Sequence, residues 1–88
     1  MYYLYMLKNL KGKLYIGITA NLQDRLYYHN TKQGAQFTKS KSKFYLAFSE
    51  EYNTLAEARK REIQIKKWRR DKKEILIERY KNGLSTKI

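Results

Sequence analysis

The 88-residue sequence contains no cysteine and few acidic residues, and these shortages exclude several classes of protein. The absence of cysteine removes disulfides, thiolate metal sites and cysteine nucleophiles together. No apolar run approaches the roughly 20 residues that span a bilayer, and no signal-peptide pattern opens the chain. We therefore expect a cytoplasmic protein without a membrane partner. A chain this short can bury only a small core, which predicts one domain.

The shortage of acid leaves a strong positive charge. Eight Asp and Glu stand against twenty Lys and Arg, which gives a formal net charge of +12. Such a charge favours a polyanion as the partner, with nucleic acid ahead of a merely basic and soluble surface. An acidic membrane surface is disfavoured, because the sequence has no lysine-rich helix with an apolar opposite face.

Two tyrosine-bearing segments open the chain and are predicted to be strands. Residues 2–8 are rich in aromatic and large apolar side chains, and residues 13–19 follow after a short turn, which favours an antiparallel hairpin. Alternation in the second strand places Ile16 on the core face, with Tyr15 and Gly17 opposite. Glycine weakens a strand unless something approaches closely. We therefore expect Gly17 to leave an open floor beside the Tyr15 hydroxyl.

A helix is predicted over residues 22–31. Asn21 is a suitable N-cap, and Arg25 and His29 lie four residues apart, one above the other at the edge of the buried stripe. Residues 32–43 form a predicted loop in which small hydroxyl residues alternate with lysines. A solvated loop and a phosphate-binding loop explain this composition equally well. The candidate phosphate ligands in the loop are Lys39, Lys41 and Lys43.

The second half of the chain is predicted to contain a strand over residues 44–48, ending at two glutamates, and then a long helix. Thr54 and Glu57 form a capping box, and the helix continues to about residue 70. Glu62 occupies a position that the pattern reserves for apolar residues. A carboxylate there needs a cation, a donor or a metal. Lys66, four residues on, can be that partner, so a structural ion pair stays open as an explanation.

The densest basic run covers residues 68–73 and precedes a predicted last helix over residues 72–82. Asp71 is expected to cap this helix and Gly83 to end it. Its expected apolar face comprises Ile75, Leu76 and Tyr80. We expect a domain over residues 1–82 and a short tail over 83–88 that frays near its end. The cations of the run that we expect to contact nucleic acid are Arg69, Arg70 and Lys72, and Gly17 is a further candidate contact.

The order and spacing of four motifs resemble the GIY-YIG endonuclease family, in particular its small single-domain bacterial members. The motifs are Tyr3-Leu4-Tyr5, Leu14-Tyr15-Ile16-Gly17-Ile18-Thr19, Arg25-x-x-x-His29 and Ala58-Arg59-Lys60-Arg61-Glu62. The resemblance covers residues 2–76. It implies an α+β fold in which a three-stranded antiparallel sheet is flanked by helices, in the order β-β-α-β-α-α.

The resemblance also implies a role for each matching residue. Tyr5 matches the tyrosine of the first motif, although Tyr3 replaces its glycine, and Tyr15 opens a complete second motif. Arg25 and His29 match the helix positions, and Glu62 matches the glutamate that holds one divalent metal. Many active members carry an Asn or another polar residue beyond this glutamate. The corresponding stretch here, residues 73–77, contains no Asn.

These residues can be assigned to the steps of phosphodiester hydrolysis. Glu62 with waters and a substrate phosphate can hold Mg²⁺, which would stabilise the leaving 3′-oxygen. Arg25 would stabilise charge in the transition state. Tyr5 is our first candidate for the general base, if nearby positive charge lowers its pKa from about 10. The sequence leaves Tyr15 and His29 open as alternative bases.

The sequence therefore predicts a metal-dependent endonuclease that acts on DNA, with branched or repair-related DNA among the candidate substrates and RNA also open. The alternative is a nucleic-acid-binding module without catalytic activity on the same fold, which the missing Asn favours. A protein partner that targets the enzyme is a further expectation. An interaction module for proteins alone is the weakest reading, because the charge is so uniformly basic.

Overall fold

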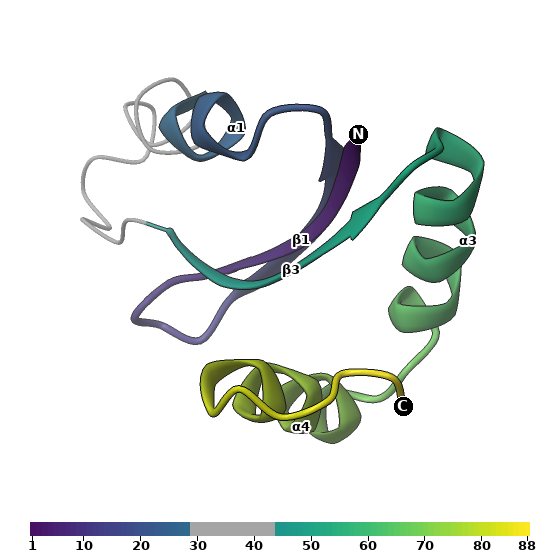
Figure 1. Ribbon diagram of the computed structural model, residues 1–88. Helices are drawn as coiled ribbons and strands as arrows, with labels where there is room; N and C mark the ends of the chain where they lie inside the picture. Colours follow the sequence, from purple (N-terminus) through teal and green to yellow (C-terminus); the bar gives the residue numbers. More distant parts are fainter. Residues whose placement is uncertain (29–43) are drawn as a thin grey trace.

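A computed structural model describes residues 1–28 and 44–88 and has an α+β fold (Figure 1). Three antiparallel strands form one sheet in the order β2-β1-β3. Within the described residues three helices flank the sheet, and the predicted fold class is confirmed. The elements in chain order are β1 (Tyr2–Lys8), β2 (Leu14–Thr19), α1 (Leu22–Tyr28), β3 (Tyr45–Tyr52), α3 (Leu55–Lys66) and α4 (Arg70–Lys81).

Strand β1 lies at the centre of the sheet and is covered on both faces. Leu4 and Met6 are fully buried on one face, and Tyr5 and Leu7 are almost fully buried on the other. A strand covered on both sides reads as a continuous apolar run, which explains the composition of the opening segment. Tyr5 lies opposite Gly17 of β2, so the first two motifs meet in the centre of the sheet.

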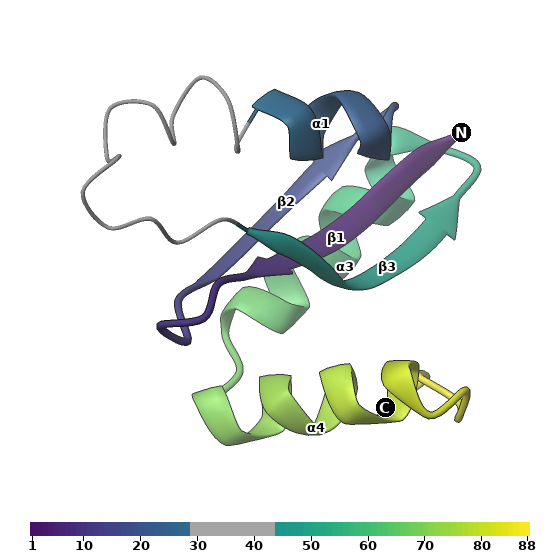
Figure 2. The ribbon, with the colours of Figure 1, turned by 90° about the vertical axis from the view of Figure 1, so that its left-hand side faces the viewer.

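The hydrophobic core lies between the sheet and two helices. Its buried members are Leu4, Met6, Phe48, Ile65 and Leu76. Helices α3 and α4 pack on this side of the sheet, and α1 lies on the other side (Figures 1 and 2). Ile16 and Ile18 of β2 pack against the same cluster, which confirms the predicted alternation in that strand.

Helix α3 begins as predicted but ends earlier. The Thr54 hydroxyl accepts a hydrogen bond from the Glu57 backbone N–H at 3.2 Å, as the capping box requires. The helix ends at Lys66, where the Trp68 N–H bonds to the Ile65 carbonyl in a tightened last turn. This turn redirects the chain and lets Trp68 pack against the core.

Helix α4 corrects two predictions. It begins at Arg70 after Arg69 as N-cap, so Asp71 is not the cap and lies in the first turn, where an acid is favoured. Ile77 packs on the core, whereas Ile75 is 53% exposed. The buried face therefore carries residues 76, 77 and 80, which share one side of a helix. The ring of Tyr80 meets that of Phe48 edge-on at 5.4 Å.

The predicted stop at Gly83 is confirmed. Its φ of +71° is a left-handed conformation that glycine adopts without strain. The N–H of Gly83 bonds to the Tyr80 carbonyl and that of Leu84 bonds to the Arg79 carbonyl. This pair of bonds is a Schellman motif, which ends the helix and turns the chain back.

Two further expectations about this half of the chain were wrong. Strand β3 continues through Glu50 and Glu51 to Tyr52, because these residues pair with β1. The C-terminal segment, residues 84–88, is not frayed where Arg61 holds it by main-chain oxygens. Within residues 1–28 and 44–88, every helix is too short or too polar to cross a membrane.

Candidate active site

The centre of the site is the pair Tyr5 and Gly17, which face each other on β1 and β2. A Cβ atom built on Gly17 would lie 2.6 Å from the Tyr5 hydroxyl oxygen and 2.9 Å from the adjoining ring carbon. Any side chain at position 17 would therefore displace Tyr5. The open floor expected at Gly17 was wrong, because the side chain of Tyr5 already occupies this space.

Two tyrosine rings are stacked at this position. The ring centroids of Tyr5 and Tyr15 lie 6.2 Å apart, and the ring planes differ by 20°. Tyr5 is the inner member, with 2% of its surface exposed, and Tyr15 is the outer member, with 39% exposed. The outer tyrosine is therefore the one of the two that presents its surface to solvent.

The environment of Tyr5 raises the pKa of its phenol to about 12. Burial is the largest cause, and the charges of Tyr15 and Glu62 act in the same direction, while Arg25 opposes them. The predicted lowering of this pKa was therefore wrong, because loss of hydration outweighs the guanidinium charge. At neutral pH the phenol keeps its proton, so it can donate a hydrogen bond but is not suited to be the general base.

Arg25 and Glu62 come from helices on opposite sides of the sheet, yet the charges of both act on the Tyr5 phenol. Arg25 is half-buried on α1, which begins at the predicted N-cap, where the Asn21 side chain accepts from the Asp24 N–H at 3.1 Å. Glu62 is buried on α3. Four of the predicted site residues are thus brought into one neighbourhood: Tyr5, Tyr15, Arg25 and Glu62.

Glu62 forms the ion pair that the sequence left open. The Lys66 ammonium lies 3.2 Å from one carboxylate oxygen, and an Arg59 nitrogen lies 3.8 Å from the other. Both cations are more than half exposed, whereas the Glu62 side chain is 11% exposed. The carboxylate is therefore fixed by the helix, while its partners extend into solvent.

The donor set fits a water-rich magnesium site. Mg²⁺ keeps several waters and is commonly held by one or two carboxylates together with substrate phosphate. Glu62 supplies one such hard oxygen donor. Over residues 1–28 and 44–88, no three carboxylates, histidines or cysteines cluster, which argues against a site built wholly from protein ligands there. A cation at Glu62 would take the place of the Lys66 ammonium.

The basic run is used in part within the protein itself. Arg70 donates to the Glu74 carboxylate at 2.7 Å and to the Gly12 carbonyl. The Lys72 ammonium lies 4.3 Å from the centre of the Trp68 ring, a cation–π contact. Arg69 is exposed at the start of α4. The remaining candidate residues lie outside the described part of the chain: His29, Lys39, Lys41 and Lys43.

Two polar clusters near the site were missed by the sequence reasoning. Glu74 binds Lys8 at 2.9 Å as well as Arg70, and the Lys8 hydrogen bond is the main cause that lowers the pKa of Glu74. These contacts tie the β1–β2 hairpin to α4. The second cluster is centred on Arg61 and Glu50. The feature of the sequence that could have pointed to this cluster is that Arg61 directly precedes Glu62.

One known family model covers most of the chain. The model of the GIY-YIG catalytic domain matches residues 1–75. The chain belongs to the GIY-YIG family. GIY-YIG domains are nuclease domains and typically use divalent metals, so nucleic acid is the class of substrate that the family implies.

Relatives of this GIY-YIG chain are small UPF0213 proteins. One from Bacillus pumilus is 40% identical over 77 residues, which cover 88% of this chain and 79% of the relative. Another, from Staphylococcus saprophyticus, is 40% identical over 76 residues, 86% of this chain and 93% of the relative. The solution NMR structure of a UPF0213 protein from Bacillus halodurans matches with a TM-score of 0.57 and 30% identity, covering 89% of this chain and 84% of that one.

Proposed function

We propose that this GIY-YIG protein is a metal-dependent endonuclease that hydrolyses phosphodiester bonds in DNA. The observation that carries the proposal is the convergence on one buried phenol. Tyr5 is stacked on Tyr15, and its pKa responds to the charges of both Arg25 and Glu62. A donor, a cation and a carboxylate from three separate elements thus influence one another, which supports a site that binds a scissile phosphate. Core packing alone does not require this combination.

The proposed roles follow from the chemistry of each group. Arg25 binds phosphate oxygens and offsets their growing charge in the transition state. Tyr5, protonated at neutral pH, donates a hydrogen bond to the same phosphate. Glu62 would hold Mg²⁺, which supplies charge neutralisation at the leaving oxygen when bound. Because the high pKa of Tyr5 does not suit it to accept a proton, we assign the general base to Tyr15 or His29.

The reaction conserves atoms without a further co-reactant. A water oxygen forms a bond to phosphorus while the bond from phosphorus to the 3′-oxygen breaks. The base accepts one proton from the water, and the 3′-oxygen takes up a proton from solvent. The products are a 5′-phosphate and a 3′-hydroxyl.

The substrate proposal is supported by charge. The net charge of +12 favours a polyanion, and branched or repair-related DNA is the first class to test, with RNA as a comparison. A cytoplasmic site of action is part of the proposal, supported by a sequence without cysteine that suits a reducing compartment. The proposal also includes a protein partner that directs the enzyme to its substrate.

The test is cleavage of labelled branched, single-stranded and duplex DNA with Mg²⁺ and then with EDTA. We expect cleavage that EDTA abolishes, and that is lost in Glu62→Gln and in Arg25→Ala. Glu78→Gln is the matched control, since it removes the same charge from an exposed position on α4. The proposal fails if no substrate is cut, or if both site variants cut as well as the parent.

One observation favours a second candidate, a nucleic-acid-binding module without activity. Residues 73–77 contain no Asn, and the Glu62 carboxylate is already paired with Lys66. The module would bind DNA with an affinity that falls steeply as salt rises, because each phosphate contact releases counterions. It would leave every substrate intact with or without Mg²⁺. Binding without any salt dependence would contradict both candidates.

A further inference from the structure

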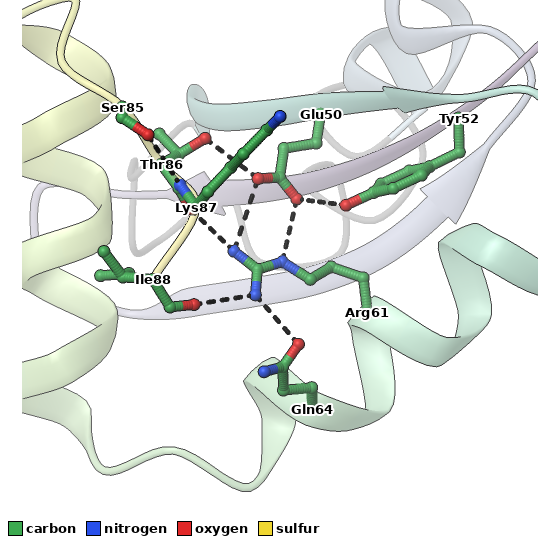
Figure 3. Close-up of polar contacts among 8 residues, drawn as sticks. All are labelled: Glu50, Tyr52, Arg61, Gln64, Ser85, Thr86, Lys87 and Ile88. Atoms are coloured by element: carbon green, nitrogen blue, oxygen red, sulfur yellow. Dashed lines mark hydrogen bonds and ion pairs between the residues drawn. The ribbon is translucent and has the colours of Figure 1, made fainter.

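Arg61 directly precedes Glu62 on α3, and its side chain contacts β3 and the C-terminal segment. Figure 3 shows its guanidinium reaching from α3 toward Glu50 on β3 and toward the C-terminal segment. The Arg61 Nε donates to Glu50 at 3.1 Å, and a terminal nitrogen reaches the other Glu50 oxygen at 3.5 Å. This is a two-point contact between a helix and a strand.

The same guanidinium also holds the C-terminal segment. It donates to the main-chain oxygens of Thr86 at 2.8 Å and Ile88 at 3.1 Å. Thr86 in turn donates from its hydroxyl to Glu50 at 3.0 Å (Figure 3). A third contact, at 2.9 Å, runs to Gln64 on its own helix. The Arg61 side chain therefore links α3, β3 and the C-terminal segment at one point.

The Arg61 link is largely buried. The side chains of Arg61 and Glu50 are 11% and 13% exposed. The Tyr52 hydroxyl donates to Glu50 at 2.7 Å, and the Trp68 ring lies 5.3 Å from the Arg61 guanidinium carbon. Since an α-helix has 3.6 residues per turn, successive side chains point about 100° apart. Fixing the direction of Arg61 therefore fixes the direction of the residue that follows it.

We propose that Arg61 is a positioning residue, which sets the rotation of α3 through Glu50 and the C-terminal segment and so presents Glu62 to the site. This inference rests on the proposed function of Glu62 as the metal-holding carboxylate. Within residues 1–28 and 44–88, Glu62 forms ion pairs with Arg59 and Lys66, whose side chains are both more than half exposed. Ala58 and Ile65 bury the apolar side of α3, and Arg61 adds buried polar contacts to β3 and to the C-terminal segment.

The test compares Arg61→Gln, Arg61→Lys and the double variant Glu50→Gln/Arg61→Gln. Arg61→Gln leaves the buried Glu50 carboxylate unpaired and can prevent folding. The double variant has no unpaired buried charge, and we expect it to fold even then. Arg79→Gln is the matched control, because Arg79 binds the Ser85 carbonyl of the C-terminal segment from α4 and does not hold α3. All measurements are made well below the unfolding temperature of each variant.

The first readout is the Glu62 carboxyl carbon signal in metal-free, ¹³C-labelled protein. We expect it to shift in Arg61→Gln and in the double variant, to recover partly in Arg61→Lys, and to stay in place in Arg79→Gln. The second readout is Mn²⁺ binding by water-proton relaxation. We expect affinity to fall about 10- to 100-fold in Arg61→Gln, as for other residues that orient a metal ligand.

The outcomes separate the two proposals. A folded Arg61 variant with an unmoved Glu62 signal overturns the positioning role, whatever the metal does. An equal shift in Arg79→Gln overturns it as well, because general loosening of the C-terminal segment would then be the cause. If the parent protein neither binds Mn²⁺ nor cuts DNA, the proposed function fails, while the Glu62 signal still decides the role of Arg61.

Discussion

Two carboxylates on neighbouring elements, Glu50 and Glu62, are both largely buried and both paired with cations, yet the pairs differ. Glu50 is paired with Arg61, whose side chain is 11% exposed. Glu62 is paired with Lys66 and Arg59, whose side chains are 54% and 58% exposed. In the Glu50 pair both the acid and the cation are buried. In the Glu62 pair the acid is buried and the cations are exposed.

The difference indicates which carboxylate can exchange its partner. Arg61 would have to give up bonds to Glu50 and to two main-chain oxygens before it could move. Lys66 is more than half exposed and can move into water, where its ammonium is hydrated, while Arg59 stays beside the Glu62 carboxylate. This difference supports the proposal that Glu62 holds a metal, whereas the contacts of Glu50 hold α3 and the C-terminal segment to β3.

The largest effect on stability is expected from Arg61→Met. This change leaves the Glu50 carboxylate buried without its partner, which typically costs about 3–5 kcal/mol of unfolding free energy. Glu50→Gln/Arg61→Met should recover a large part of the loss, because no unpaired charge remains. Urea unfolding of both variants measures this. Equal losses of unfolding free energy in the single and double variants would mean that the unpaired Glu50 carboxylate is not the cause. The Glu50–Arg61 pair would then contribute no more to stability than the Glu62 pair does.

The next largest effect is expected at high pH and concerns Tyr5. Its folded pKa of about 12 exceeds the usual 10.0, so the folded state holds the phenol proton more tightly than the unfolded chain. The resulting stability, about 2–3 kcal/mol, is fully present below pH 10 and is lost as the pH rises toward 12. The stability difference between the parent and Tyr5→Phe, from urea unfolding, should shrink by this amount from about pH 9 to about pH 12. Tyr45→Phe, at an exposed position, is the control.

A constant difference between the parent and Tyr5→Phe across this pH range would show that Tyr5 titrates like an exposed tyrosine. The buried environment described for Tyr5, which is near Glu62, would then be wrong. The shift in Tyr52, also to about 12, arises from burial and from its hydrogen bond to Glu50. The stability difference between the parent and Tyr52→Phe should therefore shrink in the same pH window, because the phenol that titrates is present only in the parent.

A smaller effect is expected from Gly17→Ala. The added Cβ would lie 2.6 Å from the Tyr5 hydroxyl, so the ring must move, and crowding of this kind costs about 1–3 kcal/mol of unfolding free energy. Thermal unfolding measures the loss. Adding Gly17→Ala to Tyr5→Phe should cost less unfolding free energy than adding it to the parent, because Phe lacks the hydroxyl oxygen that is closest to the new Cβ. Full activity and stability in Gly17→Ala would show that Tyr5 and Gly17 are not matched to each other.

Much of this comparison could be predicted from the sequence, and the reasons for the rest are physical. Alternation in β2 and the capping box at Thr54 are local patterns, and both were confirmed. The end of α3 was missed because burial of Trp68 decides it, which is a tertiary effect. The direction of the Tyr5 pKa was missed for the same reason: charge can be counted along a chain, but burial cannot.

The pairing of Arg61 with Glu50 was missed because the two residues lie 11 positions apart on different elements. No periodicity links a strand residue to a helix residue. The anchoring of the C-terminal segment was missed with it, since a short polar stretch after a helix stop is typical of a frayed end. By contrast, the Lys66 partner of Glu62 was anticipated, because both lie on one helix four residues apart.

The smallest effect on stability is expected from Lys66→Gln, and it tests the comparison most directly. Removing an exposed ammonium should change the free energy of unfolding by no more than about 1 kcal/mol, in contrast to Arg61→Met. Because Lys66 and a metal cannot both occupy the same carboxylate oxygens, Mn²⁺ affinity should rise by up to about fivefold. Lys67→Gln, an exposed neighbour, controls for the general loss of positive charge. Affinity that rises equally in both variants would assign the effect to net charge, and affinity that falls in Lys66→Gln would make Lys66 part of the cation site itself.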